Sequence, residues 1–394
     1  MTKSVNTSAH SALKKAQRIV IKVGSALLMQ DEHGNLRQDW MRAMAQDIAA
    51  LQNLGKQVIL VSSGAIALGR GELGLIQDSL TLEQSQAAAA TGQIALAQAW
   101  REVLAEQGCR GAQILLTVDD TEQRRRYLNA RGTLNTLLGL KVVPVINEND
   151  TVATQEIRYG DNDRLAARVA AMTSSDCLIL LSDVDGLYAD QNRIGEAEAH
   201  IAEVKQLDDE IYAMAGASKN RFSSGGMITK LEAARLATQA GAHMILADGR
   251  QDHALGGLID GTSRCTFFQA HHSPHDARKS FIAGSLQNGS RVHIDAGAAK
   301  ALHNGKSLLY IGVTQIEGQF ERGACVAVIC DGAEIARGLV EHSNSASQAF
   351  IGKQTDEIAA ELDYYGRTEL IHRDNLVLTH TQDDETGMGE QNDK

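Results

Sequence analysis

The sequence has little proline, few aromatic residues and no long apolar run. Only 2 of its 394 residues are proline and 4% are aromatic, which excludes collagen-like and proline-rich linker proteins. No segment approaches the roughly 18 consecutive apolar residues of a membrane-spanning helix, so no membrane partner is expected. Basic residues are also fewer than acidic ones, 38 against 49. The resulting net charge of −11 argues against a broad nucleic-acid-binding or anionic-membrane surface.

Cysteine is scarce as well, with 5 residues and no CxxC spacing. Because this number is odd and the spacing is irregular, the sequence predicts neither a disulfide framework nor a zinc site. Residues 1–17 lack the continuous apolar stretch of a signal peptide. We therefore expect a cytoplasmic protein.

The hydrophobic content of 43% is sufficient for two or three domains in a chain of 394 residues. In the first two thirds, short aliphatic runs alternate with longer segments whose apolar residues repeat at helical spacing. Unbroken aliphatic runs are typical of strands covered on both faces in a parallel sheet. The predicted strands are 19–23, 58–61, 114–116, 142–146, 178–181 and 244–246, and the predicted helices include 39–54, 82–105, 164–172 and 227–240.

The pattern changes near residue 271, after which short β-like runs are interrupted by glycines. We therefore expect an open, mainly parallel-sheet α/β sandwich over residues 16–270 and a small β-rich domain over residues 277–378. The polar residues 379–394 are predicted to form a disordered tail.

Two motifs look like nucleotide-binding loops but lack the required context. Gly69–Gly74 matches G-x-G-x-x-G, yet the strand before it ends near Ser62, so the motif does not follow a strand directly. We interpret it as a glycine-rich turn. Residues 305–307 resemble the end of a P-loop, but Lys300 occupies the position of the first glycine. Neither standard nucleotide loop is predicted.

Three other segments place lysines, hydroxyls and glycines where a strand ends or a helix begins. Lys22 lies near the end of the first predicted strand, two residues before Gly24, so its ammonium group and nearby backbone N–H groups can approach an anion. Ser63 and Gly64 follow the second strand, and Ser224–Lys230 leads into a helix. Helix starts offer unpaired N–H groups to phosphates and carboxylates. Each segment taken alone also fits an ordinary turn or helix cap.

Two clusters of Asn and Asp, in 147–150 and 160–163, are the most informative feature of the sequence. Both lie beside hydrophobic elements of a βαβ pattern, in which ligands bind at the carboxyl ends of the strands. Together they can bind an ammonium group, orient a small polar substrate and hold Mg²⁺ through water. Ser182 and Asp183 follow another buried strand and suit a nucleotide, although such residues are also common in turns.

This combination is typical of phosphoryl transfer, in which a protein positions the reactants and neutralises the charge of the transferring group. An acceptor that is already an ionised carboxylate needs little help from a general base. A metal hydrolase is disfavoured because the 13 histidines form no HExxH pattern. A triad hydrolase is disfavoured because no G-x-S-x-G elbow occurs.

From about Ala16 to Leu378 the sequence resembles the glutamate 5-kinases of the amino acid kinase family, which make glutamyl 5-phosphate for proline synthesis. The part after residue 277 resembles a PUA domain, a fold seen in RNA-modifying enzymes and appended to many of these kinases. The string VPVINEND at 143–150 is the most diagnostic. The motifs that carry the resemblance are Lys22–Ser25, Ser63–Ile66, Leu128–Arg131, Val143–Asp150, Gly160–Asp163 and Gly225–Lys230.

The resemblance implies a role for each candidate residue. Lys22 and Lys230 would stabilise the transferring phosphoryl group as catalytic residues, and Asp163 would hold both lysines in place. The residues implied to bind L-glutamate are Ser63, Asp150 and Asn162. ATP would bind with Mg²⁺, whose protein ligands the sequence leaves open. The residues implied for ATP are Lys22, Ser182, Asp183, Ser224, Gly225, Gly226, Met227, Ile228, Thr229 and Lys230; Ser182 and Ser224 replace the family's usual Thr and keep its hydroxyl.

The resemblance further implies feedback inhibition by L-proline, a homo-oligomer, and coupling to a glutamyl phosphate reductase. Two alternatives stay open. One is a different amino acid kinase, such as an acetylglutamate or uridylate kinase, and the other is an RNA-binding accessory protein that uses the PUA-like domain. Between residues 277 and 378 there are 10 basic and 12 acidic residues, and this balance favours regulation or assembly over nucleic-acid binding.

Overall fold

The computed structural model describes residues 6–31, 34–75, 77, 79–152, 161–190, 193–215, 226–284, 289–361 and 367–379. The chain divides into two compact units, Met1–Ala277 and Arg278–Lys394. The division falls inside helix α12 (Pro274–Gly284). Among the described helices, none combines the length and the apolar character needed to cross a membrane.

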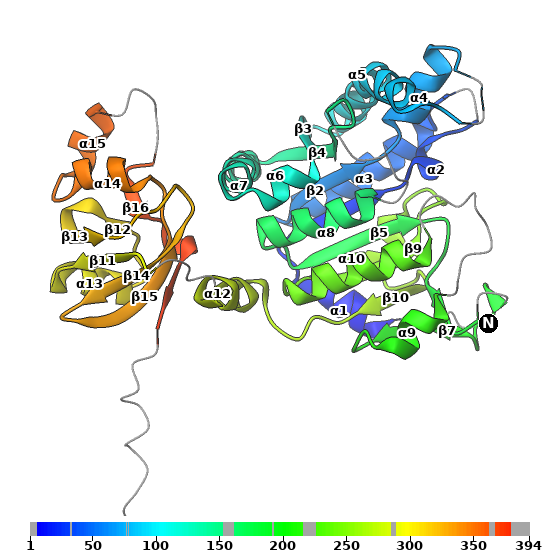
Figure 1. The fold of residues 1–394 in the computed structure, drawn as a ribbon. Coiled ribbons are helices and arrows are strands. Elements are labelled where there is room, and N and C mark those ends of the chain that lie inside the picture. Colours follow the sequence, from blue (N-terminus) through cyan, green and yellow to red (C-terminus); the bar gives the residue numbers. More distant parts are fainter. Residues whose placement is uncertain are drawn as a thin grey trace, which may run out of the picture. The chain divides into compact units, whose positions relative to one another are not determined.

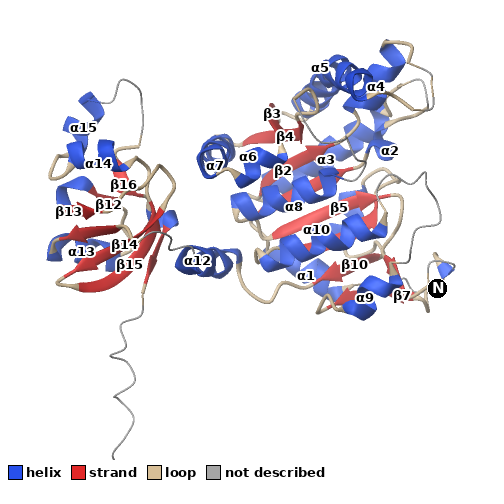
Figure 2. Ribbon diagram, viewed as in Figure 1, coloured by secondary structure: helices blue, strands red, loops and turns tan. Residues whose placement is uncertain are grey.

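The first unit is built on one eight-stranded sheet in the order β3-β4-β2-β1-β5-β9-β10-β8 (Figures 1 and 2). The described pairings are parallel except that of β9 with β10. The predicted fold class, a mainly parallel α/β sheet, is therefore confirmed. The strands are β1 (Arg18–Val23), β2 (Gln57–Ser62), β3 (Arg110–Leu116), β4 (Val142–Glu148), β5 (Cys177–Ser182), β8 (Glu203–Val204), β9 (His243–Asp248) and β10 (Cys265–Phe268).

Helices cover both faces of this sheet. Successive residues of a strand point to opposite faces, so Ile19 and Ile21 pack on one helical layer and Val20 on the other. The first layer contains α1 (Thr7–Lys15), α3 (Gln38–Asn53), α5 (Leu82–Glu106) and α11 (Ala254–Ile259). The second contains α7 (Arg124–Gly139), α8 (Asp161–Thr173) and α10 (Met227–Gln239), and Figure 1 shows α8 and α10 side by side. The shorter helices are α2 (Ser25–Leu28), α4 (Ala65–Glu72), α6 (Val118–Glu122) and α9 (Asp209–Met214).

Strand β1 lies inside the sheet, between β2 and β5. Strands β2, β3 and β4 lie on one side of it, and β5, β8, β9 and β10 lie on the other. A parallel α/β sheet binds ligands at the carboxyl ends of its strands, at the point where the strand order reverses. The carboxyl end of β1 is that point. The fold therefore places Lys22 at this point, between two groups of strands.

Helices α4 and α5 approach each other very closely because both carry glycine where they cross. A Cβ atom on Gly69 would lie 1.8 Å from the carbonyl oxygen of Ala88. One on Gly92 would lie 1.9 Å from that of Ala65. The interpretation of Gly69–Gly74 as a glycine-rich turn is therefore wrong for its first part, since Gly69 lies inside α4 and is required by helix packing.

Two arginines hold the carboxyl-terminal end of α8. Nε of Arg131, on α7, donates to the carbonyl oxygen of Met172 at 3.0 Å. Nη1 of Arg18, at the start of β1, donates to the carbonyl oxygen of Thr173. Positive side chains at this end of a helix complement its dipole. The motif Leu128–Arg131 thus anchors the helix whose opposite end carries the predicted site residues.

The second unit is β-rich, as predicted. Its main sheet has five strands in the order β13-β11-β14-β15-β17, packed around a core that includes Val292, Val326 and Tyr310. The strands are β11 (Arg291–Ile294), β12 (Leu308–Leu309), β13 (Val313–Glu317), β14 (Cys325–Cys330), β15 (Ala333–Leu339), β16 (Glu369–Ile371) and β17 (Leu376–Leu378). The helices are α13 (Ala296–His303), α14 (Asn344–Phe350) and α15 (Thr355–Glu361).

Candidate active site

Two lysines and one aspartate meet on the face of the sheet that α8 and α10 cover. Lys22 is two residues from Val20 on β1, so its side chain points to the same face. Its Nζ lies 2.6 Å from Oδ1 of Asp163, and Nζ of Lys230 lies 3.3 Å from Oδ2. The side chains of Lys22 and Lys230 are 10% and 8% exposed, and that of Asp163 is 1% exposed. The three predicted catalytic residues form one buried cluster.

Asp163 is ionised in this cluster. Burial alone raises the pKa of a carboxyl group, but the ammonium groups of Lys22 and Lys230 outweigh burial and hold the pKa of Asp163 below its ordinary value. The cluster then contains two positive charges and one negative charge. A buried excess of positive charge suits an anionic group that gains negative charge as it reacts, such as a phosphoryl group.

On the β2 and β4 side, Asn162 joins Ser63, a second predicted glutamate ligand, to Asn147 of β4. Its Nδ2 donates to Oγ of Ser63 at 2.7 Å and to Oδ1 of Asn147 at 3.0 Å. Nδ2 of Asn147 donates to Oε1 of Gln93, on α5, at 2.7 Å. Oδ1 of Asn162 is buried and has no hydrogen-bond partner among the described residues. Leaving such an acceptor unpaired is costly, so this atom suits a donor group on a ligand.

Asp150 lies in the turn that follows β4 and is half-buried. Helix α8 begins at Asp161 and not near Arg164 as predicted, so Asn162 and Asp163 belong to its first turn. The positive end of the helix dipole favours negative groups there. Residues 153–160, which complete the predicted segment and include Gly160, lie outside the described residues.

On the β5 side, Ser182 ends its strand and donates from Oγ to Oδ1 of Asp183 at 3.0 Å. The loop beyond is held by Asp185, whose Oδ1 accepts from the Tyr188 hydroxyl at 2.7 Å and whose Oδ2 lies 3.4 Å from Nη1 of Arg264. A short hairpin of β6 (Leu187–Tyr188) and β7 (His200–Ile201) follows. The two residues predicted for ATP thus begin a loop tied to the start of β10.

The predicted nucleotide loop is described only from Gly226 onward, and Ser224 and Gly225 lie outside the described residues. Gly226 directly precedes α10, and the first turn of that helix contains Met227, Ile228 and Thr229. Oγ1 of Thr229 donates to the carbonyl oxygen of Gly226 at 2.8 Å and lies 3.4 Å from Oδ2 of Asp163. The start of α10 is therefore joined to the charged cluster by Thr229 as well as by Lys230.

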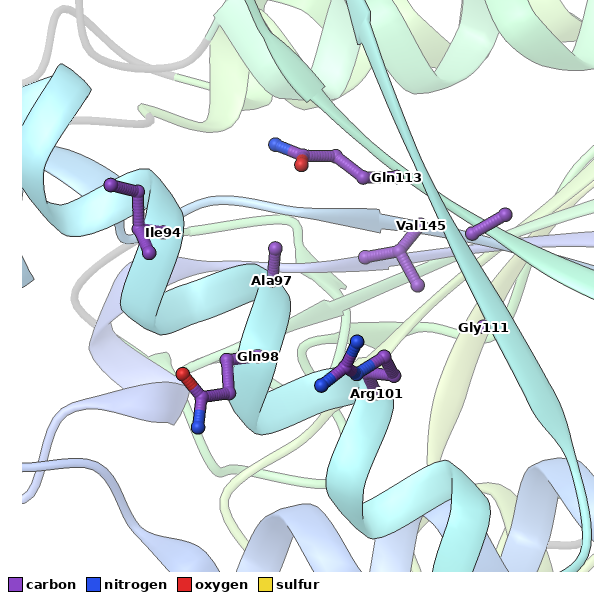
Figure 3. Close-up of a pocket in the computed structure, with 8 residues that line it drawn as sticks. Ile94, Ala97, Gln98, Arg101, Gly111, Gln113 and Val145 are labelled. Carbon is purple, nitrogen blue, oxygen red and sulfur yellow. The ribbon is translucent and has the colours of Figure 1, made fainter.

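A separate hollow of about 410 Å³ lies between α5, β3 and β4 (Figure 3). None of the predicted site residues lines it, and Arg101 is the one charged side chain among its lining residues. We therefore do not assign it as the active site. The lining residues are Ile94, Ala97, Gln98, Arg101, Gly111, Ala112, Gln113 and Val145.

The part of the chain that the structure describes contains no group of three or more His, Cys, Asp or Glu side chains that could hold a metal ion. Asp163 is enclosed between two ammonium groups and is poorly placed to bind a cation. The described His, Cys, Asp and Glu side chains therefore do not form a metal site by themselves.

Sequence reasoning missed Gln93. This residue lies within the long helix α5, and no motif marks it. One signal was present, because the neighbouring Gly92 is a glycine inside a helical pattern, which often indicates a close approach of another segment. The sequence does not show that the approach brings this turn of α5 to the polar end of β4.

The two lysines held by one carboxylate at the reversal point of a parallel sheet define a candidate phosphoryl-transfer site, and family comparison agrees. The model of the amino acid kinase family matches residues 17–248, and the model of the PUA domain matches residues 290–362.

Glutamate 5-kinase of Brucella ovis is 52% identical over 372 residues, covering 94% of this chain and 98% of the relative. Glutamate 5-kinase of Paramagnetospirillum magneticum is 52% identical over 369 residues, covering 93% of this chain and 99% of the relative. Among solved structures, UMP kinase from Ureaplasma parvum is 15% identical with a TM-score of 0.46, covering 65% of this chain and 99% of that one. The chain belongs to the amino acid kinase family and, within it, to the glutamate 5-kinases.

Proposed function

We propose that this protein transfers the terminal phosphoryl group of ATP to the γ-carboxylate of L-glutamate, yielding ADP and L-glutamyl 5-phosphate, the first step of proline biosynthesis. The observation that carries the proposal is the buried cluster of Lys22, Asp163 and Lys230. In the reaction the bond between the γ-phosphorus and the β,γ-bridging oxygen breaks, and a bond from the phosphorus to a carboxylate oxygen forms. The acceptor is already ionised, so no proton has to be removed from it.

The two lysines are proposed to act on the charge that develops on the transferring group. Lys22 comes from β1 and Lys230 from α10, so their ammonium groups approach the cluster from different elements. Asp163 keeps both ammonium groups near one point, and this preorganised charge stabilises a phosphoryl group in transfer more than it stabilises the bound substrates. Lys22 and Lys230 are thus the proposed catalytic residues, and Asp163 holds them.

The two substrates are proposed to bind on opposite sides of β1. Ser63, Asp150 and Asn162 follow β2, β4 and the start of α8, and we assign them to L-glutamate. Asp150 suits the α-ammonium group and Ser63 a carboxylate. The β5 side and the start of α10 are assigned to ATP, through Lys22, Ser182, Asp183 and the segment Ser224–Lys230. This arrangement brings both reacting groups to the carboxyl end of β1.

Mg²⁺ is proposed to arrive bound to the phosphates of ATP. Magnesium commonly keeps several waters and is held by substrate phosphates with one or two carboxylates, in place of an all-protein cage. The absence of a metal-binding cluster among the described residues is compatible with this arrangement. When bound, the ion would neutralise phosphate charge.

Trapping the acyl phosphate with hydroxylamine tests the proposal. The full-length chain should form γ-glutamyl hydroxamate from L-glutamate, MgATP and hydroxylamine, with matching release of ADP. N-acetylglutamate and UMP, offered in parallel, should not replace glutamate. If no glutamate-dependent ADP appears, or if one of the other acceptors is preferred, the assignment of the substrate is wrong.

Substitutions should separate catalysis from binding. We expect Lys22→Ala or Lys230→Ala to lower kcat by roughly a hundredfold or more with smaller changes in KM, because both lysines act on developing charge. Asp150→Ala should mainly raise the glutamate KM, because its carboxylate binds the substrate before and during reaction. Steady-state kinetics, with the concentration of each substrate varied in turn, measures whether each variant changes kcat or the glutamate KM. Equal, mild effects at all three positions would mean that these segments are only structural.

L-proline is proposed as a feedback inhibitor that uses the glutamate pocket. Proline has the α-carboxylate and α-nitrogen of glutamate but no γ-carboxylate, so it can occupy the same contacts without accepting a phosphoryl group. It should raise the apparent glutamate KM more than the ATP KM, and substitutions within 149–158 should weaken inhibition more than turnover. Steady-state kinetics with the concentrations of both substrates varied tests whether proline and glutamate share a pocket. Inhibition that does not respond to glutamate concentration would contradict a shared pocket.

The roles of the two domains, the oligomeric state, the cellular location and the coupling to a second enzyme are also proposals. Residues 16–270 carry the kinase sites, and the PUA-like part, 277–378, acts in regulation or assembly. The active form is proposed to be a cytoplasmic homo-oligomer. Coupling to a glutamyl phosphate reductase fits the chemistry, because an acyl phosphate hydrolyses readily and benefits from rapid consumption.

A further inference from the structure

Gln93 stands at the far end of a chain of side-chain amides that reaches the proposed glutamate site. The chain runs from Gln93 on α5 through Asn147 at the end of β4 to Asn162 at the start of α8, and it ends at Ser63. The donor–acceptor distances along it are 2.7, 3.0 and 2.7 Å. Helix α5, strand β4, helix α8 and the loop between β2 and α4 therefore meet through three hydrogen bonds between side chains.

The orientations of the amides of Asn162 and Asn147 follow from their hydrogen-bond partners. The Nδ2 atom of Asn162 has two hydrogens, and it donates to Ser63 and to Asn147. Because Oδ1 of Asn147 accepts from Asn162, Nδ2 of Asn147 faces Gln93, which presents an oxygen acceptor. Two polar groups remain at the end of this chain of amides. Oδ1 of Asn162 is an acceptor without a partner among the described residues, and the Ser63 hydroxyl, which accepts from Asn162, keeps its own hydrogen to donate.

We propose that Gln93 is a positioning residue that sets which atoms of Asn162 and Ser63 face the amino acid substrate. Its Oε1 fixes the amide of Asn147, and Asn147 fixes the amide of Asn162. Oδ1 of Asn162 then faces the α-ammonium group, and the hydroxyl of Ser63 faces a carboxylate. This inference rests on the proposed function, since it names the polar groups through which that site selects an α-amino acid.

Removing the acceptor at Gln93 should release this orientation. Asn147 can then turn its amide and direct Nδ2 towards Asn162, which places two donors against each other. Asn162 relieves the conflict by turning its own oxygen towards Asn147, and its nitrogen then faces the substrate ammonium. An acceptor is replaced by a donor at the point where a positive group binds. A lost hydrogen bond to a charged group corresponds to roughly a tenfold or larger loss of affinity.

Two substitutions at Gln93 test the proposal in the full-length chain, with the hydroxamate assay. Gln93→Met has a similar length and no strong acceptor, and it should raise the glutamate KM roughly tenfold or more, while kcat and the ATP KM change less than about threefold. Gln93→Glu keeps an oxygen acceptor at the same place, and its glutamate KM should stay within about threefold of the wild type. Gln98→Met is the matched control, because Gln98 lies on the same helix and donates to Glu102.

The outcomes separate positioning from plain structural support. Equal increases in both KM values for Gln93→Met, together with a lower melting temperature, would overturn the proposal in favour of a structural role. An unchanged Gln93→Met variant, or a Gln93→Glu variant as impaired as Gln93→Met, would also overturn it. If the wild type makes no hydroxamate from glutamate, the proposed function fails and this inference fails with it. If the wild type makes the hydroxamate and Gln93→Met has the same kinetics as the wild type, this inference is wrong but the proposed function stands.

Discussion

Replacing Asp163 by asparagine is expected to lower kcat by roughly a hundredfold or more and to destabilise the folded chain. The carboxylate contacts both Lys22 and Lys230, and its side chain is 1% exposed. Asparagine preserves the shape but leaves two buried ammonium groups without the negative charge that holds them together. Removing one partner of a buried ion pair costs about 3–5 kcal/mol in the free energy of unfolding. Urea denaturation and steady-state kinetics measure the two effects.

The pH dependence gives this prediction a second test. The pKa of Asp163 is held below its ordinary value, so its charge stabilises the folded state above about pH 4, and this contribution is lost as the pH falls further. The difference in the free energy of unfolding between wild type and Asp163→Asn should therefore have its full value at pH 7 and become smaller below about pH 4. Asp39→Asn is the control, because the side chain of Asp39 is 94% exposed, and its stability should match the wild type. A variant at 163 as stable as wild type at pH 7 would contradict the account.

Gly92→Ala is expected to destabilise the first unit strongly for so small a substitution. The added Cβ would lie 1.9 Å from the carbonyl oxygen of Ala65 and 2.5 Å from the backbone nitrogen of Gly69, and neither backbone atom can move without shifting α4. Overpacking of this kind costs about 1–3 kcal/mol, and more where the backbone must separate. Helix α4 begins directly after Ser63 and Gly64, so the glutamate KM should rise as well. Thermal unfolding and kinetics of the purified variant provide the measurement.

Gly132→Ala is the matched control for this substitution. Gly132 also lies inside a helix, α7, but a Cβ built there meets nothing within 4 Å. Alanine lowers the conformational entropy of the unfolded chain, so this variant should be more stable than wild type by about 0.5–1 kcal/mol. The change in the free energy of unfolding is therefore expected to have opposite signs for Gly92→Ala and Gly132→Ala. Destabilisation at both, or at neither, would mean that the crossing of α4 and α5 does not depend on the absence of a side chain.

Much of the first unit could be predicted from its aliphatic runs, because strands buried on both faces contain little else. Strand β5, for example, is buried at all six positions and reads CLILLS. Strand β15 in the second unit could not be predicted in this way, for the opposite reason. Its sequence, AEIARGL, is charged and only partly buried, so hydrophobicity does not distinguish it from a loop. Two strand pairs, β6 with β7 and β10 with β8, are joined through very few residues. Such short pairings produce no periodic hydrophobic pattern in the sequence.

The candidate site could be predicted as a set of residue types at strand ends and helix starts, but its geometry could not. The resemblance implied that Asp163 serves two lysines. The buried contact itself depends on α8 starting at Asp161, which places Asp163 in the first turn, whereas the periodic apolar pattern indicated a start near Arg164. Gln93 could not be identified because its role arises from the contact of α5 with the end of β4, far along the chain from its own position. The neighbouring Gly92 indicates that another segment comes close, but it does not show which one.

The interior position of β1 also has a consequence for the synthesis of the protein. Ile19 of β1 pairs with Cys177 of β5, and at about 5–20 residues per second the ribosome needs roughly 10–30 s to produce that partner. During this interval one edge of an apolar strand is unpaired and can join another nascent chain. The yield of soluble protein in cells should therefore depend on chaperone supply and on the speed of translation, even where the completed sheet is stable.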